Sequence, residues 1–309
     1  MELIRGLHNI RAKHRGCVAT VGKFDGIHLG HHAVLSQLLT LAEELKVPAL
    51  VTVFEPQPNE YFQGHSAPAR LTRFREKFEL IANAGIDRML CVTFDDALAS
   101  LSAKAFIETL LVDGVGVRAL VSGRDFRFGR GREGNLQLLE TAAADYGFLV
   151  VPAETFMLDG YQVSSTRVRE SLTHGDLNET RRLLGRDYSV SGRVIRGDGR
   201  GRGKGFPTVN IRLNRLVSPL QGIFAVRVHG VDARIYGGVA YLATRRSYPT
   251  GETPMLEVFV LEFDTMIYHQ HIRVDFIAKL RDDIVFDSAA ELAEQVEQDV
   301  ANARQVLKS

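Results

Sequence analysis

The chain has 309 residues, which is long enough for two ordinary domains or one large one. Apolar residues make up 45% of it, enough for a sizeable core, and a formal net charge of +1 gives no general affinity for nucleic acid or acidic membranes. The first residues are charged and lack the apolar core of a signal peptide, and no run reaches the roughly 20 apolar residues of a membrane span. We therefore expect a cytoplasmic protein with neither a membrane nor a nucleic-acid partner.

The first half alternates short apolar runs with helical patterns. Strands are expected in five valine-rich runs, at 17–22, 47–54, 88–94, 118–123 and 147–151. Helices are expected where apolar residues recur at three- and four-residue spacing, at 32–46, 73–85 and 103–114. This alternation predicts a parallel sheet with helices on both faces, and ligands of such sheets bind at the carboxyl ends of the strands.

From about Tyr188 the pattern changes to closely spaced strands with glycine, proline or charged turns between them. The stretch HIRVDFIAKL is the clearest, because it places Ile272, Val274 and Phe276 on one face and charged residues on the other. Such strands predict an antiparallel barrel or sandwich. We place the boundary between the two halves near residues 185–187.

The chain ends in a helical pattern at 288–307, introduced by Ser288 and Glu291 at the spacing of a capping box. The two cysteines, Cys17 and Cys91, lie in apolar runs without the pair spacing of a metal site. They are expected to be buried free thiols in a reducing compartment.

The stretch VGKFDGIHLGHHAVL, from Val21 to Leu35, joins the first expected strand to a helix. Its glycines let the backbone turn sharply and approach a ligand, and the helix start offers unpaired N–H groups to an anion. His28 and His31 are three residues apart and share a face if the stretch is helical. They suit a phosphate chain; metal ligation is the weaker alternative, because no third ligand or acidic partner lies nearby in the sequence.

FDGIHLGH resembles the HxGH signature of the nucleotidyltransferase superfamily. Further stretches follow in order: FEPQP (54–58), RLT (70–72), GRDFRFGRGREG (123–134) and SSTRVR (164–169). Together they are similar to the adenylyltransferase half of the prokaryotic bifunctional riboflavin kinase/FAD synthetase family. The resemblance covers essentially the whole chain and implies a Rossmann-like nucleotidyltransferase domain at 1–186, followed by a β-barrel riboflavin kinase domain with a terminal helix at 187–309.

In such an enzyme an oxygen of the FMN phosphate attacks the α-phosphorus of ATP directly, so the protein positions the reactants and neutralises charge. The resemblance implies catalytic roles for His28 and His31. It implies that ATP and its phosphates are bound by Gly22, Phe24, Asp25, Gly26, Gly30, Ser165, Thr166 and Arg169. It also implies a flavin site, in which aromatic faces stack on the isoalloxazine ring, formed by Phe54, Pro56, Asp125, Phe126 and Phe128.

In the second half, GDGRGRGKGFPTVNI (197–211) resembles the riboflavin kinase signature. Thr208 and Asn210 would bind Mg²⁺ and the ATP phosphates, since oxygen ligands suit a hard cation. Gly203 and Gly205 would fold over the nucleotide. Glu257 in LEVFVLEFD matches the family's catalytic glutamate and would accept the proton of the ribityl hydroxyl. Glu262 lies on the opposite face if the strand is continuous.

This half departs from the family pattern at several positions. Tyr241, Ala243 and Arg246 replace asparagine, glycine and proline, and Asp283 stands where glutamate is usual. These changes bring the efficiency of the kinase, or its choice of flavin, into question.

The resulting hypothesis is a two-step enzyme that phosphorylates riboflavin to FMN and then adenylylates FMN to FAD, with ATP as substrate and Mg²⁺ as cofactor. One alternative is an FMN adenylyltransferase with a weak or altered kinase half. Another, of a different class, is an RNA- or nucleotide-binding module that uses the RGRGKG loop; balanced charge argues against it. Oligomeric state is not predicted.

Overall fold

The computed structural model describes residues 1–196, 208–242, 255–263, 265 and 267–308. The chain divides into two compact units. The first comprises residues 1–68 and 77–163, and the second comprises residues 69–76 and 164–309. A short segment from the first half of the sequence therefore packs with the second unit, which no local sequence pattern indicates.

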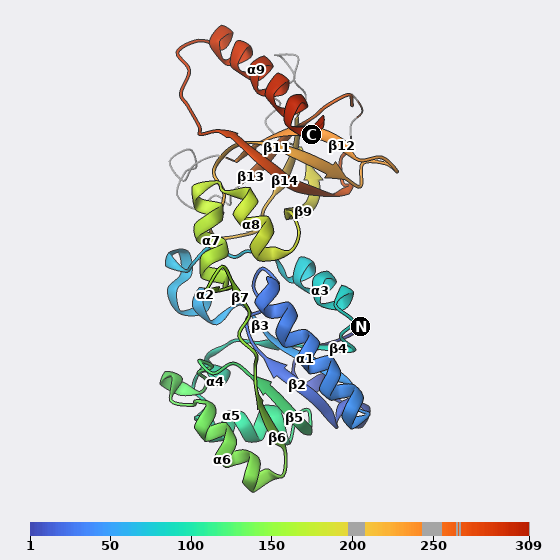
Figure 1. Ribbon diagram of the computed structural model, residues 1–309, viewed down its shortest axis with the longest axis vertical. Coiled ribbons are helices and arrows are strands. Elements are labelled where there is room, and N and C mark those ends of the chain that lie inside the picture. Colours follow the sequence, from blue (N-terminus) through green and yellow to red (C-terminus); the bar gives the residue numbers. More distant parts are fainter. Residues whose placement is uncertain (197–207, 243–254, 264, 266, 309) are drawn as a thin grey trace. The chain divides into compact units, whose positions relative to one another are not determined.

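The first unit contains a six-stranded sheet whose strands are all parallel, in the order β1-β4-β3-β2-β5-β6 (Figure 1). The strands are β1 (Glu2–Arg5), β2 (Cys17–Val21), β3 (Ala49–Glu55), β4 (Arg88–Thr93), β5 (Val117–Ser122) and β6 (Leu149–Pro152). The parallel sheet and its five valine-rich strands confirm the sequence prediction. The additional strand β1 lies at the edge of the sheet, where its charged ends conceal the strand pattern.

Helices connect these strands. They are α1 (Leu29–Leu45), α2 (Pro58–Gln63), α3 (Phe74–Asn83), α4 (Asp96–Ala99), α5 (Ala103–Phe106) with a π-helical continuation at Ile107–Val112, and α6 (Leu136–Tyr146). Short 3₁₀ turns occur at Leu7–Asn9, Ala12–His14, Gly64–Ser66 and Arg130–Arg132, and a two-residue hairpin joins β7 (Met157–Leu158) to β8 (Tyr161–Gln162). The expected helix at 103–114 thus changes to π-helical geometry after Phe106.

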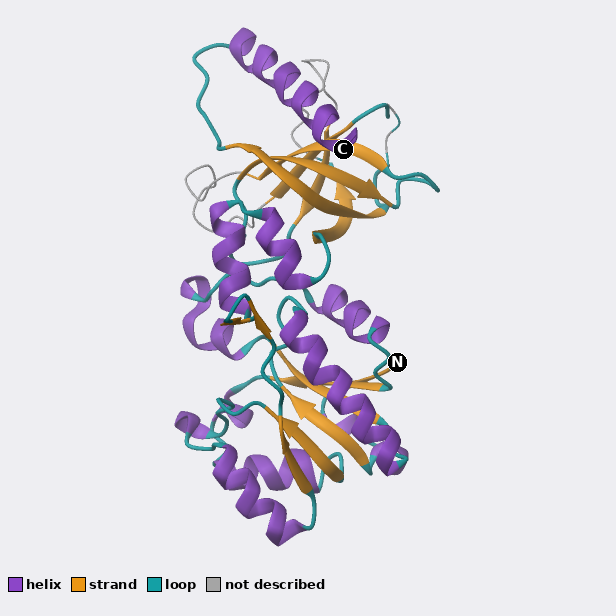
Figure 2. Ribbon diagram, in the orientation of Figure 1, coloured by secondary structure: helices purple, strands orange, loops and turns teal. Residues whose placement is uncertain are grey.

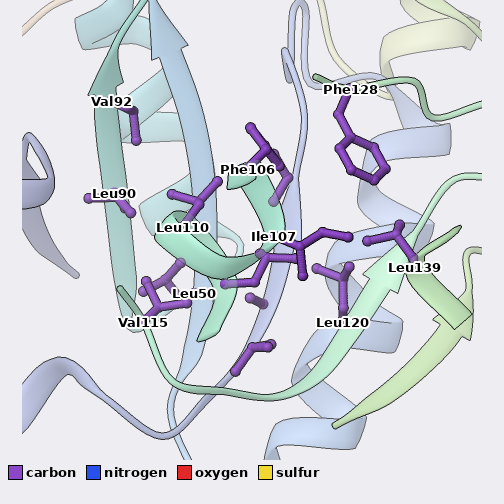
Figure 3. Packing of buried hydrophobic residues seen from close by; sticks show 14 of the residues in the cluster. Leu50, Leu90, Val92, Phe106, Ile107, Leu110, Val115, Leu120, Phe128 and Leu139 are labelled. Carbon is purple, nitrogen blue, oxygen red and sulfur yellow. The ribbon is translucent and has the colours of Figure 1, made fainter. Parts of the chain in front are cut away.

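The sheet is buried on both faces. Cys17 and Ala19 of β2 belong to a core formed with the π-helical turn and α6, whereas Leu35 and Leu38 are buried residues of α1, which contacts β2 and β3. Figure 3 shows Leu110 of the π-helical turn among strand residues of this core. Both cysteines are buried free thiols, as predicted, and burial raises the pKa of Cys17 to about 12.

The second unit contains a closed antiparallel barrel in the order β10-β13-β12-β11-β14-β9 (Figure 2). The strands are β9 (Tyr188–Ile195), β10 (Thr208–Arg212), β11 (Gly222–His229), β12 (Tyr236–Leu242), β13 (Met255–Val260) and β14 (His271–Arg281). Ile272, Val274 and Phe276 are buried inside it, which confirms their predicted shared face. The β9–β10 and β9–β14 pairs close the sheet, so of the two predicted alternatives the unit is a barrel and not a sandwich.

Helices α7 (Ser165–His174), α8 (Leu177–Leu184) and α9 (Ala289–Lys308) complete the second unit. The helix α9 packs on β11, β12 and β14 (Figure 2). Its first turn is capped as predicted, because Ser288 Oγ accepts the N–H of Glu291 at 3.2 Å. No helix among the described ranges is long and apolar enough to cross a membrane.

Candidate active sites

The first candidate site lies at the carboxyl end of β2, where the loop from Gly22 to Ile27 leads into α1. Phe24 and Ile27 adopt left-handed backbone angles (φ 45° and 42°), which are unfavourable for side-chain-bearing residues and above all for β-branched isoleucine. Both side chains are buried. The loop is therefore held in a strained path by its packing, as is common where a backbone is shaped for a ligand.

The two histidines of the HxGH motif lie together at the start of α1. His28 is the N-cap residue, and its Nδ1 accepts the N–H of His31 at 3.2 Å. The two imidazole rings are stacked with their centroids 3.7 Å apart, and Phe24 lies 5.0 Å from the His31 ring. Because a backbone N–H can only donate, the hydrogen of a neutral His28 ring is on Nε2, the atom that can donate to a phosphate oxygen.

Gly30 permits this close arrangement. A Cβ atom at Gly30 would lie 2.9 Å from the carbonyl oxygen of Val163 and 3.1 Å from the His28 ring. Asp25, also predicted to bind ATP, is buried in the same loop with 1% of its surface exposed. Phe24, His31 and Gly30 thus pack together with His28, and Asp25 is buried in the same loop.

A buried lysine supports this loop and was missed by sequence reasoning. Lys77 on α3 has no exposed surface, and its Nζ donates to the carbonyl oxygen of Lys23 at 2.6 Å. The available signal was its spacing, because Lys77 is three residues after Phe74 and four before Ile81 and thus interrupts the apolar stripe of its helix.

Aromatic side chains gather at the carboxyl ends of the neighbouring strands. Phe54, the last residue but one of β3, contacts Phe94, which follows β4, at 5.9 Å, and Phe106 at 6.4 Å. Phe106 contacts Phe128 at 5.2 Å, and Phe128 stacks on Phe126 at 5.3 Å. The structure thereby brings together the three aromatic residues predicted for the flavin site.

Four members of this aromatic cluster were not predicted: Phe94, Phe106, Tyr61 and Phe62. Phe62, with 66% of its surface exposed, is the open end of the cluster. They come from separate elements, so only the fold reveals the set. Of the other predicted flavin-site residues, Pro56 follows β3 after a cis peptide bond, and Asp125 is exposed in the loop after β5.

The remaining predicted phosphate-binding residues of the first half lie on α7. Ser164 is the N-cap of this helix, Ser165 and Thr166 begin it, and Arg169 Nε donates to the carbonyl oxygen of Ala69 at 2.6 Å. These residues belong to the second compact unit, whereas His28 and His31 belong to the first. Their part in a common site stays a prediction.

The second candidate site lies on the outer face of the barrel. Asn210 of β10 is directly opposite Glu257 of β13, which is directly opposite Tyr241 of β12. The flanking residues Leu256 and Val258 are buried in the interior, so the alternation of the strand places these three side chains outside. Thr208, two residues before Asn210, points to the same side.

The expected strand does not extend to Glu262. β13 ends at Val260, and Glu262 lies beyond it with φ 57°. The continuous strand on which Glu257 and Glu262 would lie on opposite faces is therefore not present, because β13 is shorter than its apolar pattern, and the alternation argument does not apply to Glu262. Gly203, Gly205, Ala243 and Arg246 lie outside the described residues.

Comparisons with known proteins identify both halves. Residues 10–167 match the family model of FAD synthetase, and residues 184–307 match that of riboflavin kinase. The fold and the two candidate sites therefore belong to a chain with a nucleotidyltransferase half and a kinase half.

Curated relatives join the two halves in one protein. The chain is 43% identical over 309 residues to the bifunctional riboflavin kinase/FMN adenylyltransferase of Haemophilus influenzae, covering 100% of both chains. It is 44% identical to the protein of that name from Escherichia coli, covering 99% of this chain and 97% of the relative. The chain belongs to the bifunctional riboflavin kinase/FMN adenylyltransferase family.

A solved structure has the same fold. The crystal structure of a macrolide-efflux protein from Streptococcus pneumoniae matches with a TM-score of 0.82 at 24% identity, covering 98% of this chain and 99% of that chain. At this identity the likeness establishes the shared fold alone.

Proposed function

We propose that this chain makes FAD from riboflavin in two steps. Riboflavin and ATP give FMN and ADP, and FMN and a second ATP give FAD and pyrophosphate. The observation that carries this function is that one chain matches both family models and is similar along its whole length to relatives that bear both activities in their name. An RNA- or nucleotide-binding module and an adenylyltransferase with a weak or altered kinase half are not favoured by this double match.

We assign adenylyl transfer to residues 1–186 and the kinase to residues 187–309. The family matches at 10–167 and 184–307 support this division. The boundary between the compact units lies earlier in the sequence, between Val163 and Ser164. Helices α7 and α8 therefore pack with the barrel although they precede residue 187. The functional boundary and the packing boundary are thus different.

In the adenylyl transfer, an oxygen of the FMN phosphate attacks the α-phosphorus of ATP, and the bond to pyrophosphate breaks. His28 and His31 bind the phosphate chain at the helix start, where N–H groups and the helix dipole favour negative charge. The N–H group at His28 Nε2 then donates a hydrogen bond to a phosphate oxygen that gains charge in the transition state. Ser165, Thr166 and Arg169 are proposed to bind further phosphate oxygens.

The aromatic cluster is proposed to bind the isoalloxazine ring of FMN. Phe54, Phe126 and Phe128 are joined through ring contacts, and planar rings stack favourably on such faces. Pro56 and Asp125 are proposed to border this flavin site.

In the kinase reaction, the ribityl hydroxyl oxygen attacks the γ-phosphorus of ATP, and ADP leaves. Glu257 accepts the hydroxyl proton. Its place directly opposite Asn210 supports this role, because the phosphate-binding residue and the base share one face of the barrel.

Mg²⁺ is the proposed cofactor of both steps. The side-chain oxygens of Thr208 and Asn210 are hard ligands, and Mg²⁺ is usually bound by few protein groups together with substrate phosphates. When bound, the ion neutralises charge on the phosphates. The chain's own contribution is to hold Asn210 beside Glu257 through the β10–β13 pairing.

The cytoplasmic location remains a prediction, supported by the two free, buried thiols. The substrates are small molecules, and the expected lack of a nucleic-acid partner is also kept as a prediction.

The product assay tests the function. Purified chain is incubated with Mg-ATP and either riboflavin or FMN, and the flavins are separated by chromatography. We expect FMN and then FAD from riboflavin, and FAD directly from FMN. FAD from FMN without FMN from riboflavin would overturn the kinase assignment, and the lack of any flavin product would overturn both.

A further inference from the structure

Tyr241 is the aromatic neighbour of Glu257 on the adjacent strand β12. The two residues are directly opposite each other in the β12–β13 pair, on the outer face. Side chains in such pairs lie within contact distance of each other. A substrate that presents its hydroxyl to Glu257 therefore lies beside the Tyr241 side chain.

A hydrogen bond fixes the direction of this ring. Tyr241 Oη donates to Asp283 Oδ2 at 2.9 Å, and Asp283 lies two residues beyond the end of β14. In the barrel, β11 lies between β12 and β14, and Ile223 of β11 is paired with both Tyr241 and Arg281. The phenol thus extends away from Glu257, across β11, toward the end of β14.

The two partners are matched in length. Neighbouring strands are about 4.8 Å apart, so the two hydrogen-bonded side chains together span roughly two strand spacings. The long tyrosine side chain and the short aspartate together cover this span. Tyr241 and Asp283 are two of the positions at which this chain departs from the family pattern of asparagine and glutamate, and the structure places them in contact. We read them as one paired change.

We propose that Tyr241, held by Asp283, determines how the kinase site binds riboflavin. This inference rests on the proposed kinase function. With the ribityl hydroxyl at Glu257, the ribityl chain carries the isoalloxazine ring along the barrel surface. The phenol ring, extended in the direction of β11, offers it an aromatic face. Asp283 is a positioning residue that acts through the tyrosine.

The test measures riboflavin affinity by the quenching of flavin fluorescence, which is independent of turnover, together with KM and kcat of FMN formation. Tyr241→Phe and Asp283→Asn are each expected to raise Kd and KM for riboflavin about threefold to tenfold, with kcat changed less than about twofold. The double variant should be no worse than either single variant. Tyr241→Ala, which removes the ring, should have the largest effect.

Tyr236→Phe is the matched control, because it removes a tyrosine hydroxyl bonded to the carboxylate of Asp232 at the other end of β12. It should leave riboflavin affinity unchanged, and FAD formation from supplied FMN should be unchanged in all variants. The pair Tyr241→Asn with Asp283→Glu should restore affinity relative to Tyr241→Asn alone.

Unchanged riboflavin affinity in Tyr241→Ala would overturn the inference, as would effects of the two single changes that multiply in the double variant. Riboflavin binding by the unaltered chain without FMN formation would instead contradict the proposed kinase, and the affinity measurements would still decide the role of Tyr241.

Discussion

At the scale of single residues, the loop before α1 combines strain with tight packing. Left-handed backbone angles at non-glycine residues cost on the order of 1–3 kcal/mol each, and this loop has two, at Phe24 and Ile27. Their burial and the hydrogen bond from Lys77 to the Lys23 carbonyl hold the path. The result is a fixed position for His28, which depends on the missing side chain at Gly30.

Gly30→Ala is expected to lower FAD formation from FMN by about 10²-fold, because the added methyl group displaces the His28 ring or separates α1 from Val163. FMN formation from riboflavin should stay within about twofold. Rates with each substrate, measured on the same preparation, check both statements. Ser36→Ala, an exposed change on the same helix, is the control. Full FAD synthesis in Gly30→Ala would show that the close packing around His28 is not needed.

At the scale of elements, segment 69–76 is joined to the barrel by a buried ion pair. The Arg215 side chain is fully buried, and its Nη2 donates to Glu76 Oε2 at 2.9 Å. Glu76 Oε1 accepts the N–H of Ser191 at 2.8 Å, and Tyr188 Oη donates to the carbonyl oxygen of Leu71 at 3.1 Å. The charges compensate each other inside the second unit.

Arg215→Met is expected to destabilise the second unit by about 3–5 kcal/mol, because it leaves the Glu76 carboxylate buried without its cation. Urea unfolding of the whole chain at pH 7, monitored by the loss of FMN formation, measures this change in the free energy of unfolding. Arg234→Met removes an exposed pair with Asp232 and should cost less than about 1 kcal/mol. Equal effects of the two changes would contradict a stabilising role for the buried pair.

The same pair predicts a pH dependence. Burial pushes the pKa of Glu76 upward, but the Arg215 charge and the N–H groups of Ser191 and Arg73 outweigh it and hold the pKa below its ordinary value of 4.5. A lowered pKa stabilises the fold above pH 4.5, and this contribution is lost as the pH falls toward the lowered pKa. Glu76→Gln should remove that part of the acid sensitivity, as urea unfolding at pH 7 and pH 4 would show. If the difference in unfolding free energy between pH 7 and pH 4 were the same in Glu76→Gln as in the unaltered chain, the prediction would be contradicted.

At the scale of the whole molecule, the sequence predicted the two architectures and failed where distant segments meet. Valine-rich runs and three- to four-residue spacing arise within an element, so the parallel sheet was predictable. Barrel closure between β9 and β14, the placement of residues 69–76 in the second unit, and the joining of Phe94 with Phe106 through Phe54 are long-range contacts that no local pattern contains.

The candidate sites followed the same rule. The contact between His28 and His31 was predictable because three residues separate them at a helix start. The support from Lys77 and the bond between Tyr241 and Asp283 were not, since their partners are 54 and 42 residues away. Departures from a family pattern can be noticed in a sequence, but only the fold shows that two of them, Tyr241 and Asp283, are in contact.

The central claim is that one chain carries two separable reactions, and paired substitutions test it most directly. Glu257→Gln should lower FMN formation from riboflavin by about 10²- to 10⁴-fold and leave FAD formation from FMN intact. His28→Asn keeps a side-chain acceptor for the helix cap and should lower FAD formation by about 10²- to 10³-fold while FMN formation persists. Loss of both reactions from either substitution in a folded chain would contradict the division of labour between residues 1–186 and residues 187–309.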